Sequence, residues 1–116
     1  MNLASNGNLV KSIKDNDKLA LKLSSYKTYK KEFCTIKIYG NDLNMWMIKP
    51  ADFDPNKKYP LLMYQYSGPG SQNVANRWNG SNDYWYQMLA QQGYIIACVD
   101  GRGTGYKGAE FKKSTY

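Results

Sequence analysis

The sequence has 116 residues, a length that provides one hydrophobic core of modest size. Hydrophobic residues make up 42% and charged residues 22%, which excludes the class of intrinsically disordered chains. The formal net charge of +7 raises the question of a nucleic acid or another anionic partner, but the lysines are scattered and form no compact stripe.

The first 30 residues carry two short local patterns. Residues 6–13 combine an Asn-Gly turn with alternating apolar and polar residues, which indicates the edge of a hairpin. Residues 15–17 offer three candidate caps for a short amphipathic helix, whose apolar residues recur at helical spacing: Leu19, Leu23 and Tyr26. Because bulky apolar side chains become frequent only after Phe33, we expect this first third of the chain to be less well packed.

Two alternating segments follow, at residues 33–39 and 43–50. They predict two antiparallel strands joined by a polar turn at residues 40–42, Gly-Asn-Asp. The alternation divides the first strand into two faces, with Phe33, Thr35 and Lys37 on one and Cys34, Ile36 and Ile38 on the other.

The second half of the chain predicts a strand, a helix and a second strand. The nearly continuous apolar run at residues 61–68 is typical of a strand covered on both faces. Residues 82–92 predict a helix that stops at Gly93, and the run YIIACVD after it predicts a second buried strand. This order predicts a right-handed crossover between parallel strands and an α/β fold.

The two cysteines, Cys34 and Cys98, both lie in segments with strand patterns. Their spacing suggests neither a disulfide framework nor a metal cluster. We therefore expect two buried, unpaired thiols.

A glycine-rich loop follows the second buried strand, with Gly103, Gly105 and Gly108 at the G-x-G-x-x-G spacing of a dinucleotide-binding fingerprint. In dinucleotide-binding folds these glycines follow the first strand of the crossover rather than the second. Here they follow the second strand, and Arg102 lies among them. The pattern favours a loop that turns the chain and holds no phosphate.

Tyr66 is the residue whose position suggests chemistry. The predicted buried strand ends at Tyr66, directly before Ser-Gly-Pro-Gly. Its hydroxyl is therefore expected at the carboxyl end of that strand, where open α/β sheets place their ligands. A fixed hydrogen-bond donor there can stabilise the oxyanion of a tetrahedral intermediate. The alternative is a tyrosine that only packs, with its hydroxyl bonded inside the protein.

The stretches KKYPLLMYQYSGPGSQ and VDGRGTGYKGAEF, with a tryptophan-bearing helix between them, resemble the dipeptidyl peptidase IV family of the prolyl oligopeptidase clan of serine peptidases. The hairpin containing MWMIKPADFDP resembles the segment where that family passes from its β-propeller to its hydrolase domain. The resemblance implies the N-terminal part of an α/β-hydrolase fold with an incomplete sheet. It implies that residues 1–30 are the end of the propeller region with a linker helix, and residues 31–116 the start of the catalytic domain.

The resemblance also assigns roles to individual residues. Tyr66 corresponds to the tyrosine whose hydroxyl assists the oxyanion hole in that family. Trp85 corresponds to a supporting tryptophan on the first helix, and Asp100 and Arg102 match a DGRG turn that supports the active site. No cofactor or metal is implied.

The sequence contains no histidine and no G-x-S-x-G nucleophile motif, so the Ser-Asp-His triad is missing from it. We therefore expect a fragment of a serine-type aminopeptidase that removes N-terminal X-Pro or X-Ala dipeptides, inactive by itself. Its expected partners are a peptide substrate in the full-length enzyme and the missing propeller and C-terminal catalytic segments of the same protein. A homodimer is left open, and no nucleic acid is expected. The resemblance to bacterial members implies a periplasmic, cell-envelope or secreted location.

Two alternative interpretations belong to other classes of protein. One is a small basic module in which exposed tyrosines such as Tyr26 and Tyr29 stack on the bases of a nucleic acid or contact another anionic polymer. The other is an inactive truncated remnant, because a sheet with too few strands leaves unpaired edges.

Overall fold

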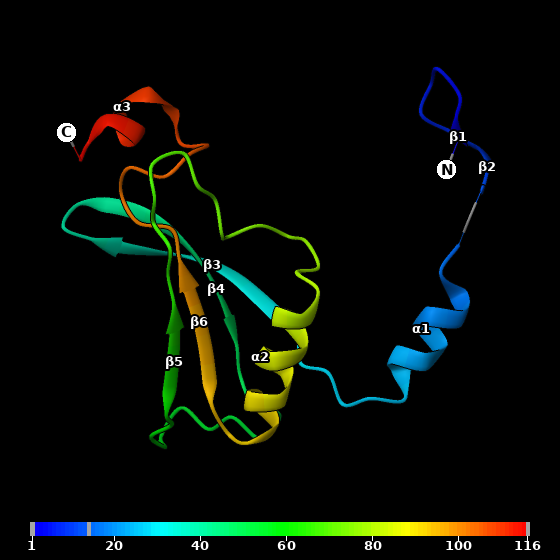
Figure 1. Ribbon diagram of the computed structural model, residues 1–116, viewed down its shortest axis with the longest axis horizontal. Coiled ribbons are helices and arrows are strands. Elements are labelled where there is room, and N and C mark those ends of the chain that lie inside the picture. The colour runs from blue at the N-terminus through cyan, green and yellow to red at the C-terminus, as the bar shows by residue number, and fades with distance from the viewer. Residues whose placement is uncertain (1, 14, 116) are drawn as a thin grey trace.

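The computed structural model describes residues 2–13 and 15–115, and its elements form a mixed sheet with a helix on one face and a separate N-terminal arm (Figure 1). The sheet belongs to residues 31–99, and the arm comprises residues 2–13 and 15–26. In chain order the elements are β1 (Asn2–Leu3), β2 (Leu9–Lys11), α1 (Asp17–Ser24), β3 (Lys31–Ile38), β4 (Asn41–Ile48), β5 (Leu61–Tyr64), α2 (Ser81–Gln91), β6 (Ile95–Val99) and α3 (Gly108–Lys113).

The four-stranded sheet has the order β3-β4-β6-β5. Neighbouring strands run antiparallel except for β5 and β6, which are parallel and are joined through α2. The predicted strand–helix–strand connection between parallel strands and the α/β class are therefore confirmed. Gly93 ends α2 with a φ of 85°, a left-handed conformation that glycine adopts without steric cost.

The β3–β4 hairpin is confirmed, but its predicted turn at residues 40–42 is wrong. Ile38 pairs with Asn41, so the turn consists of Tyr39 and Gly40 alone. Both have positive φ, 47° and 78°, as a type I′ turn requires. A two-residue turn of this type matches the right-handed twist of the strands, and it places Trp46 opposite Phe33.

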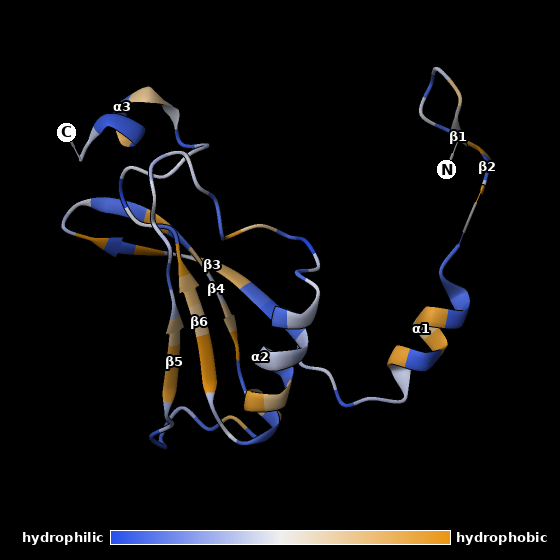
Figure 2. Cartoon of the chain, in the orientation of Figure 1, coloured by the Kyte–Doolittle hydropathy of each residue, from blue (hydrophilic) through white to orange (hydrophobic). Residues whose placement is uncertain are grey.

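The prediction that the strand at residues 61–68 is covered on both faces is also wrong. β5 ends at Tyr64 and is the edge strand of the sheet. Leu62 and Tyr64 pack against the core beside α2, whereas Leu61 and Met63 on the opposite face are exposed. The apolar run is real (Figure 2), but no helix of the described residues covers its second face.

The core lies on both faces of the sheet. The larger cluster fills the space between the sheet and α2, and its buried members are Trp46, Ile48, Val74, Tyr86, Ala90, Ile96 and Cys98. Two aromatic rings pack together in it, with the centroids of Trp46 and Tyr86 5.4 Å apart. On the opposite face Leu43, Met45, Ala97 and Val99 form a smaller cluster, against which Phe111 of α3 packs.

A buried ion pair fixes the start of α2 to β3. The Nζ atom of Lys31 lies 3.0 Å from Oδ1 of Asp83 and 4.9 Å from the centroid of the Trp46 ring. The other carboxylate oxygen of Asp83 accepts a hydrogen bond from the backbone N–H of Asn79. Because both partners are largely buried, this pair holds the helix, and the loop before it, in one position.

The N-terminal arm is weakly packed, as its sequence predicts. β1 and β2 form the expected hairpin, and α1 begins after Asn16 but buries no residue. Within the described ranges no helix combines the length and the apolar character needed to cross a bilayer.

Candidate functional site

The carboxyl ends of β5 and β6 lie at the same edge of the sheet because the two strands are parallel. Residues 65–74, the β5 segment, continue the chain from β5, and residues 100–107, the β6 segment, continue it from β6. The two segments lie side by side beyond that edge (Figure 1). Gly105 donates its N–H to the carbonyl oxygen of Ser71 at 2.9 Å, which joins the segments directly. Of the residues predicted for the site, Tyr66 lies in the first segment and Asp100 and Arg102 lie in the second.

Asp100 holds the β5 segment in place. Its side chain is buried, with 4% of the residue exposed, and its Oδ1 accepts the backbone N–H of Asn73 at 2.9 Å. Its Oδ2 accepts the N–H of Val74, also at 2.9 Å. A carboxylate that accepts backbone N–H groups in a buried loop makes strong hydrogen bonds, so Asp100 fixes the path of residues 73–74.

Tyr66 lies two residues beyond the end of β5 and is 70% exposed. Its hydroxyl makes no hydrogen bond to any group of residues 2–13 and 15–115. The phenol is therefore presented to solvent at the carboxyl edge of the parallel pair, free to donate to a ligand.

Ser67 connects the ends of the two parallel strands. Its backbone has a φ of 51°, a left-handed conformation that costs a non-glycine residue about 1–2 kcal/mol. Its Oγ accepts the N–H of Gly101 at 3.2 Å and the side-chain N–H of Gln65 at 2.8 Å. The two hydrogen bonds hold this conformation, which sets the direction in which the chain leaves Tyr66.

The structure shows no contact that joins Trp85 or Arg102 to the segment 65–74 within the described residues. Trp85 is 52% exposed on α2, and Arg102 is exposed in the β6 segment. Neither side chain forms a hydrogen bond or an ion pair within the described part of the chain. Their supporting role remains a prediction.

Sequence reasoning missed Ser67 and Asn73. The Asp100–Asn73 contact spans 27 residues, and no local pattern indicates a contact of that range. A local signal did exist for the turn at residues 68–71, because Pro69 and Gly70 are the central residues that a type II turn prefers. Gly70 has a φ of 74°, and the N–H of Ser71 bonds the carbonyl of Gly68, as that turn requires.

The prediction that both cysteines are buried is confirmed for Cys98 and wrong for Cys34. Cys98 is buried in β6, but Cys34 is exposed, because β3 is an edge strand. Burial, reinforced by the nearby carboxylate of Asp100, raises the pKa of the Cys98 thiol to about 12. Cys98 is therefore a packed thiol and no nucleophile at neutral pH.

This difference predicts selective alkylation. At pH 8 only about one Cys98 in ten thousand is a thiolate, so iodoacetamide should modify Cys34 and leave Cys98 unmodified in the folded protein. Peptide mapping by mass spectrometry measures both positions, and denaturation in guanidinium chloride should make them react alike. Equal labelling of the two cysteines in the folded protein would contradict the buried position of Cys98.

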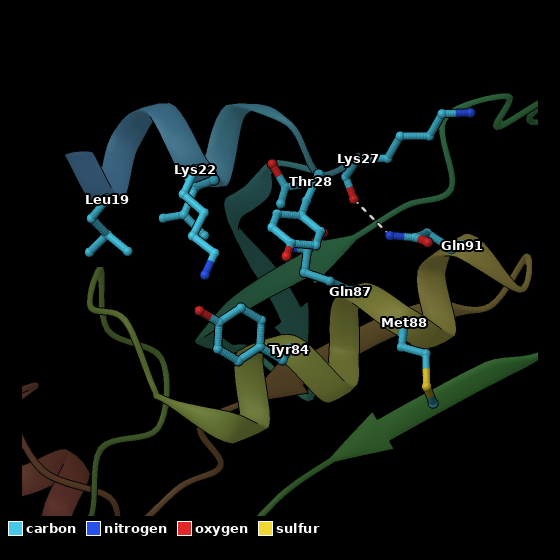
Figure 3. Close-up of a pocket in the computed structure, with 10 residues that line it drawn as sticks. Leu19, Lys22, Lys27, Thr28, Tyr84, Gln87, Met88 and Gln91 are labelled. Atoms are coloured by element: carbon cyan, nitrogen blue, oxygen red, sulfur yellow. Dashed lines mark hydrogen bonds between the residues drawn. The ribbon is translucent and has the colours of Figure 1, made fainter. Parts of the chain in front are cut away.

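A separate groove of about 510 Å³ lies between α1 and α2, away from Tyr66. In Figure 3, Leu19 and Lys22 of α1 face Tyr84 of α2, and the Nε2 of Gln91 donates to the carbonyl of Lys27 at 2.7 Å. Its lining contains no serine, cysteine, aspartate or glutamate. Nor do any three His, Cys, Asp or Glu side chains gather as metal ligands within residues 2–13 and 15–115.

Comparison with known proteins identifies relatives that match most of this chain. It is 45% identical over 96 residues to a probable dipeptidyl-aminopeptidase B of Podospora anserina, and 42% identical over 108 residues to a dipeptidyl peptidase 4 of Trichophyton equinum. These alignments cover 83% and 90% of this chain but only 10% and 14% of the relatives. No family model matches the sequence.

Comparison with solved structures also identifies dipeptidyl peptidases. The crystal structure of Porphyromonas gingivalis dipeptidyl peptidase 4 superposes with a TM-score of 0.86 at 46% identity, over 97% of this chain and 16% of that one. A putative dipeptidyl aminopeptidase IV from Bacteroides ovatus superposes with a TM-score of 0.70 at 36% identity. The chain thus spans well under a fifth of the proteins that it matches.

Proposed function

The chain is homologous to one segment of the dipeptidyl peptidase 4 family, and from this premise we propose that it forms the first part of the catalytic domain of a serine-type dipeptidyl peptidase. Residues 31–116 would open an α/β-hydrolase sheet, and residues 1–30 would lead into it from a propeller domain. The full-length protein would release dipeptides from peptides with proline or alanine as the second residue. The antiparallel β3–β4 pair and the parallel β5–β6 pair support this proposal.

The single observation that carries the proposal is the position of Tyr66. Its phenol is exposed and unbonded at the carboxyl edge of the parallel pair. When a serine oxygen bonds to the scissile carbonyl carbon, a base takes the serine proton and the carbonyl oxygen becomes negatively charged. The phenol would donate a hydrogen bond to that oxygen and lower the barrier. The serine and the base belong to other segments of the full-length protein.

An assay of the full-length protein tests this function. We expect it to hydrolyse Gly-Pro-p-nitroanilide, with one dipeptide released for each p-nitroaniline. The N-acetylated substrate should be a poor one, since a dipeptidyl aminopeptidase requires a free amino terminus. Serine-directed inactivation by diisopropyl fluorophosphate should abolish the activity. Hydrolysis of internal peptide bonds would refute the proposal. So would a failure to hydrolyse both Gly-Pro-p-nitroanilide and its N-acetylated form.

A further inference from the structure

Gly68 lies directly beneath the ring of Tyr66. A Cβ atom built on Gly68 would be 2.5 Å from Cε1 of Tyr66 and 3.1 Å from Cζ, the carbon that bears the hydroxyl. The three nearest atoms to that Cβ all belong to this ring. Because real Cβ atoms do not approach so closely, any side chain at position 68 must displace the phenol.

The ring has few other restraints. Tyr66 is 70% exposed, its hydroxyl is unbonded within residues 2–13 and 15–115, and it belongs to neither core cluster. The backbone on which it stands is well restrained, since Ser67 is bonded to Gly101 and the turn at 68–71 is closed by Ser71. The position of the phenol therefore depends on the backbone and on the bare Cα of Gly68.

We propose that Gly68 is a positioning residue for Tyr66, because its lack of a side chain lets the phenol rest against the loop in one orientation. This inference rests on the proposed function of Tyr66. It differs from an ordinary turn requirement, since Gly68 is not among the glycines with positive φ, and its backbone conformation is open to alanine.

The test is a double-mutant cycle in the full-length protein with Gly-Pro-p-nitroanilide as substrate. Gly68→Ala should lower kcat by about a hundredfold, because misplacing a reacting group by about 1 Å has an effect of that size. KM and the thermal midpoint should stay close to wild type, since the exposed ring can move aside. In the Tyr66→Phe background, Gly68→Ala should change kcat by less than about twofold, because no donor is left to misplace.

Gly40→Ala is the matched control, because Gly40 lies in the β3–β4 turn, outside the segment that carries Tyr66, and its added Cβ would meet no atom within 4 Å. It should lower stability through its positive φ and leave kcat unchanged. Should Gly68→Ala fail to fold, adding Tyr66→Ala should restore folding by removing the ring that the methyl group meets.

The outcomes distinguish a failure of the positioning role of Gly68 from a failure of the role proposed for Tyr66. If Tyr66→Phe lowers kcat but Gly68→Ala does not, the positioning inference is overturned and the function of Tyr66 stands. If the two changes are additive, Gly68 acts through some other group and the inference is also overturned. If Tyr66→Phe leaves kcat at the wild-type value, the proposed role of Tyr66 fails first. Failure of Tyr66→Ala to rescue an unfolded Gly68→Ala variant would overturn the steric argument.

Discussion

Replacing Tyr66 with Phe in the full-length protein is expected to lower kcat by about a hundred- to a thousandfold, the usual effect of removing one oxyanion donor. The change removes one oxygen atom and keeps the ring, so the contact with Gly68 is retained. The loss should fall on kcat rather than KM, because the carbonyl oxygen becomes strongly negative only in the transition state.

Pre-steady-state kinetics make this expectation specific. The phenol would act when the acyl-enzyme forms, so acylation should slow by about a hundred- to a thousandfold. The burst of p-nitroaniline, which is visible only while deacylation is slower than acylation, should slow by that factor or disappear. Tyr39→Phe is the control, because Tyr39 is fully exposed in the β3–β4 turn and lies outside the segments that follow β5 and β6. A Tyr66→Phe enzyme with a wild-type burst rate would remove the role assigned to the phenol.

The crossover could be predicted from the sequence because each of its signals is local. The apolar run before Tyr66, the helix stop at Gly93 and the apolar run after it fix a strand, a helix and a strand whatever the rest of the chain does. Parallel pairing follows from the connection through a helix, which is the crossover that parallel neighbours need. The position of Tyr66 at the shared edge then follows from the pairing alone, which is why its location could be predicted.

The hairpin turn could not be predicted by the same reasoning. Gly40, Asn41 and Asp42 are strong turn formers, and Tyr39 is a poor candidate for a positive φ. The pairing of eight residues of β3 with eight of β4 decides the register, and the favourable energy of that pairing exceeds the local strain at Tyr39. Long-range pairing outweighed local preference at this turn.

Exposure could not be predicted where it depends on neighbours. Cys34 and Met63 lie in strands with apolar patterns, but β3 and β5 are the two edges of the sheet. An apolar side chain favours burial, but its exposure is determined by the elements that cover it. The same holds for the contact of Asp100 with Asn73, which depends on the meeting of two loops 27 residues apart.

Replacing Asp100 with Ala is expected to destabilise the β5 segment by about 3 kcal/mol, because it leaves the buried N–H groups of Asn73 and Val74 without acceptors. Asp100→Asn keeps one side-chain oxygen and should cost less. A local change of about 3 kcal/mol corresponds to roughly a hundredfold faster amide hydrogen exchange through local opening. Hydrogen exchange with mass spectrometry on the full-length protein measures this in the peptide covering residues 65–77.

Asp42→Ala is the matched control for this measurement, because the Asp42 carboxylate is 61% exposed and its closest cation is 4.0 Å away. It should leave exchange at residues 65–77 unchanged. Because the Asp100 carboxylate and the Ser67 hydroxyl hold opposite ends of the segment that carries Gly68, Asp100→Ala should also lower kcat. Unchanged exchange in Asp100→Ala would mean that other contacts fix the segment, and the orientation of Tyr66 would then have to depend on Ser67 and Gly68 alone.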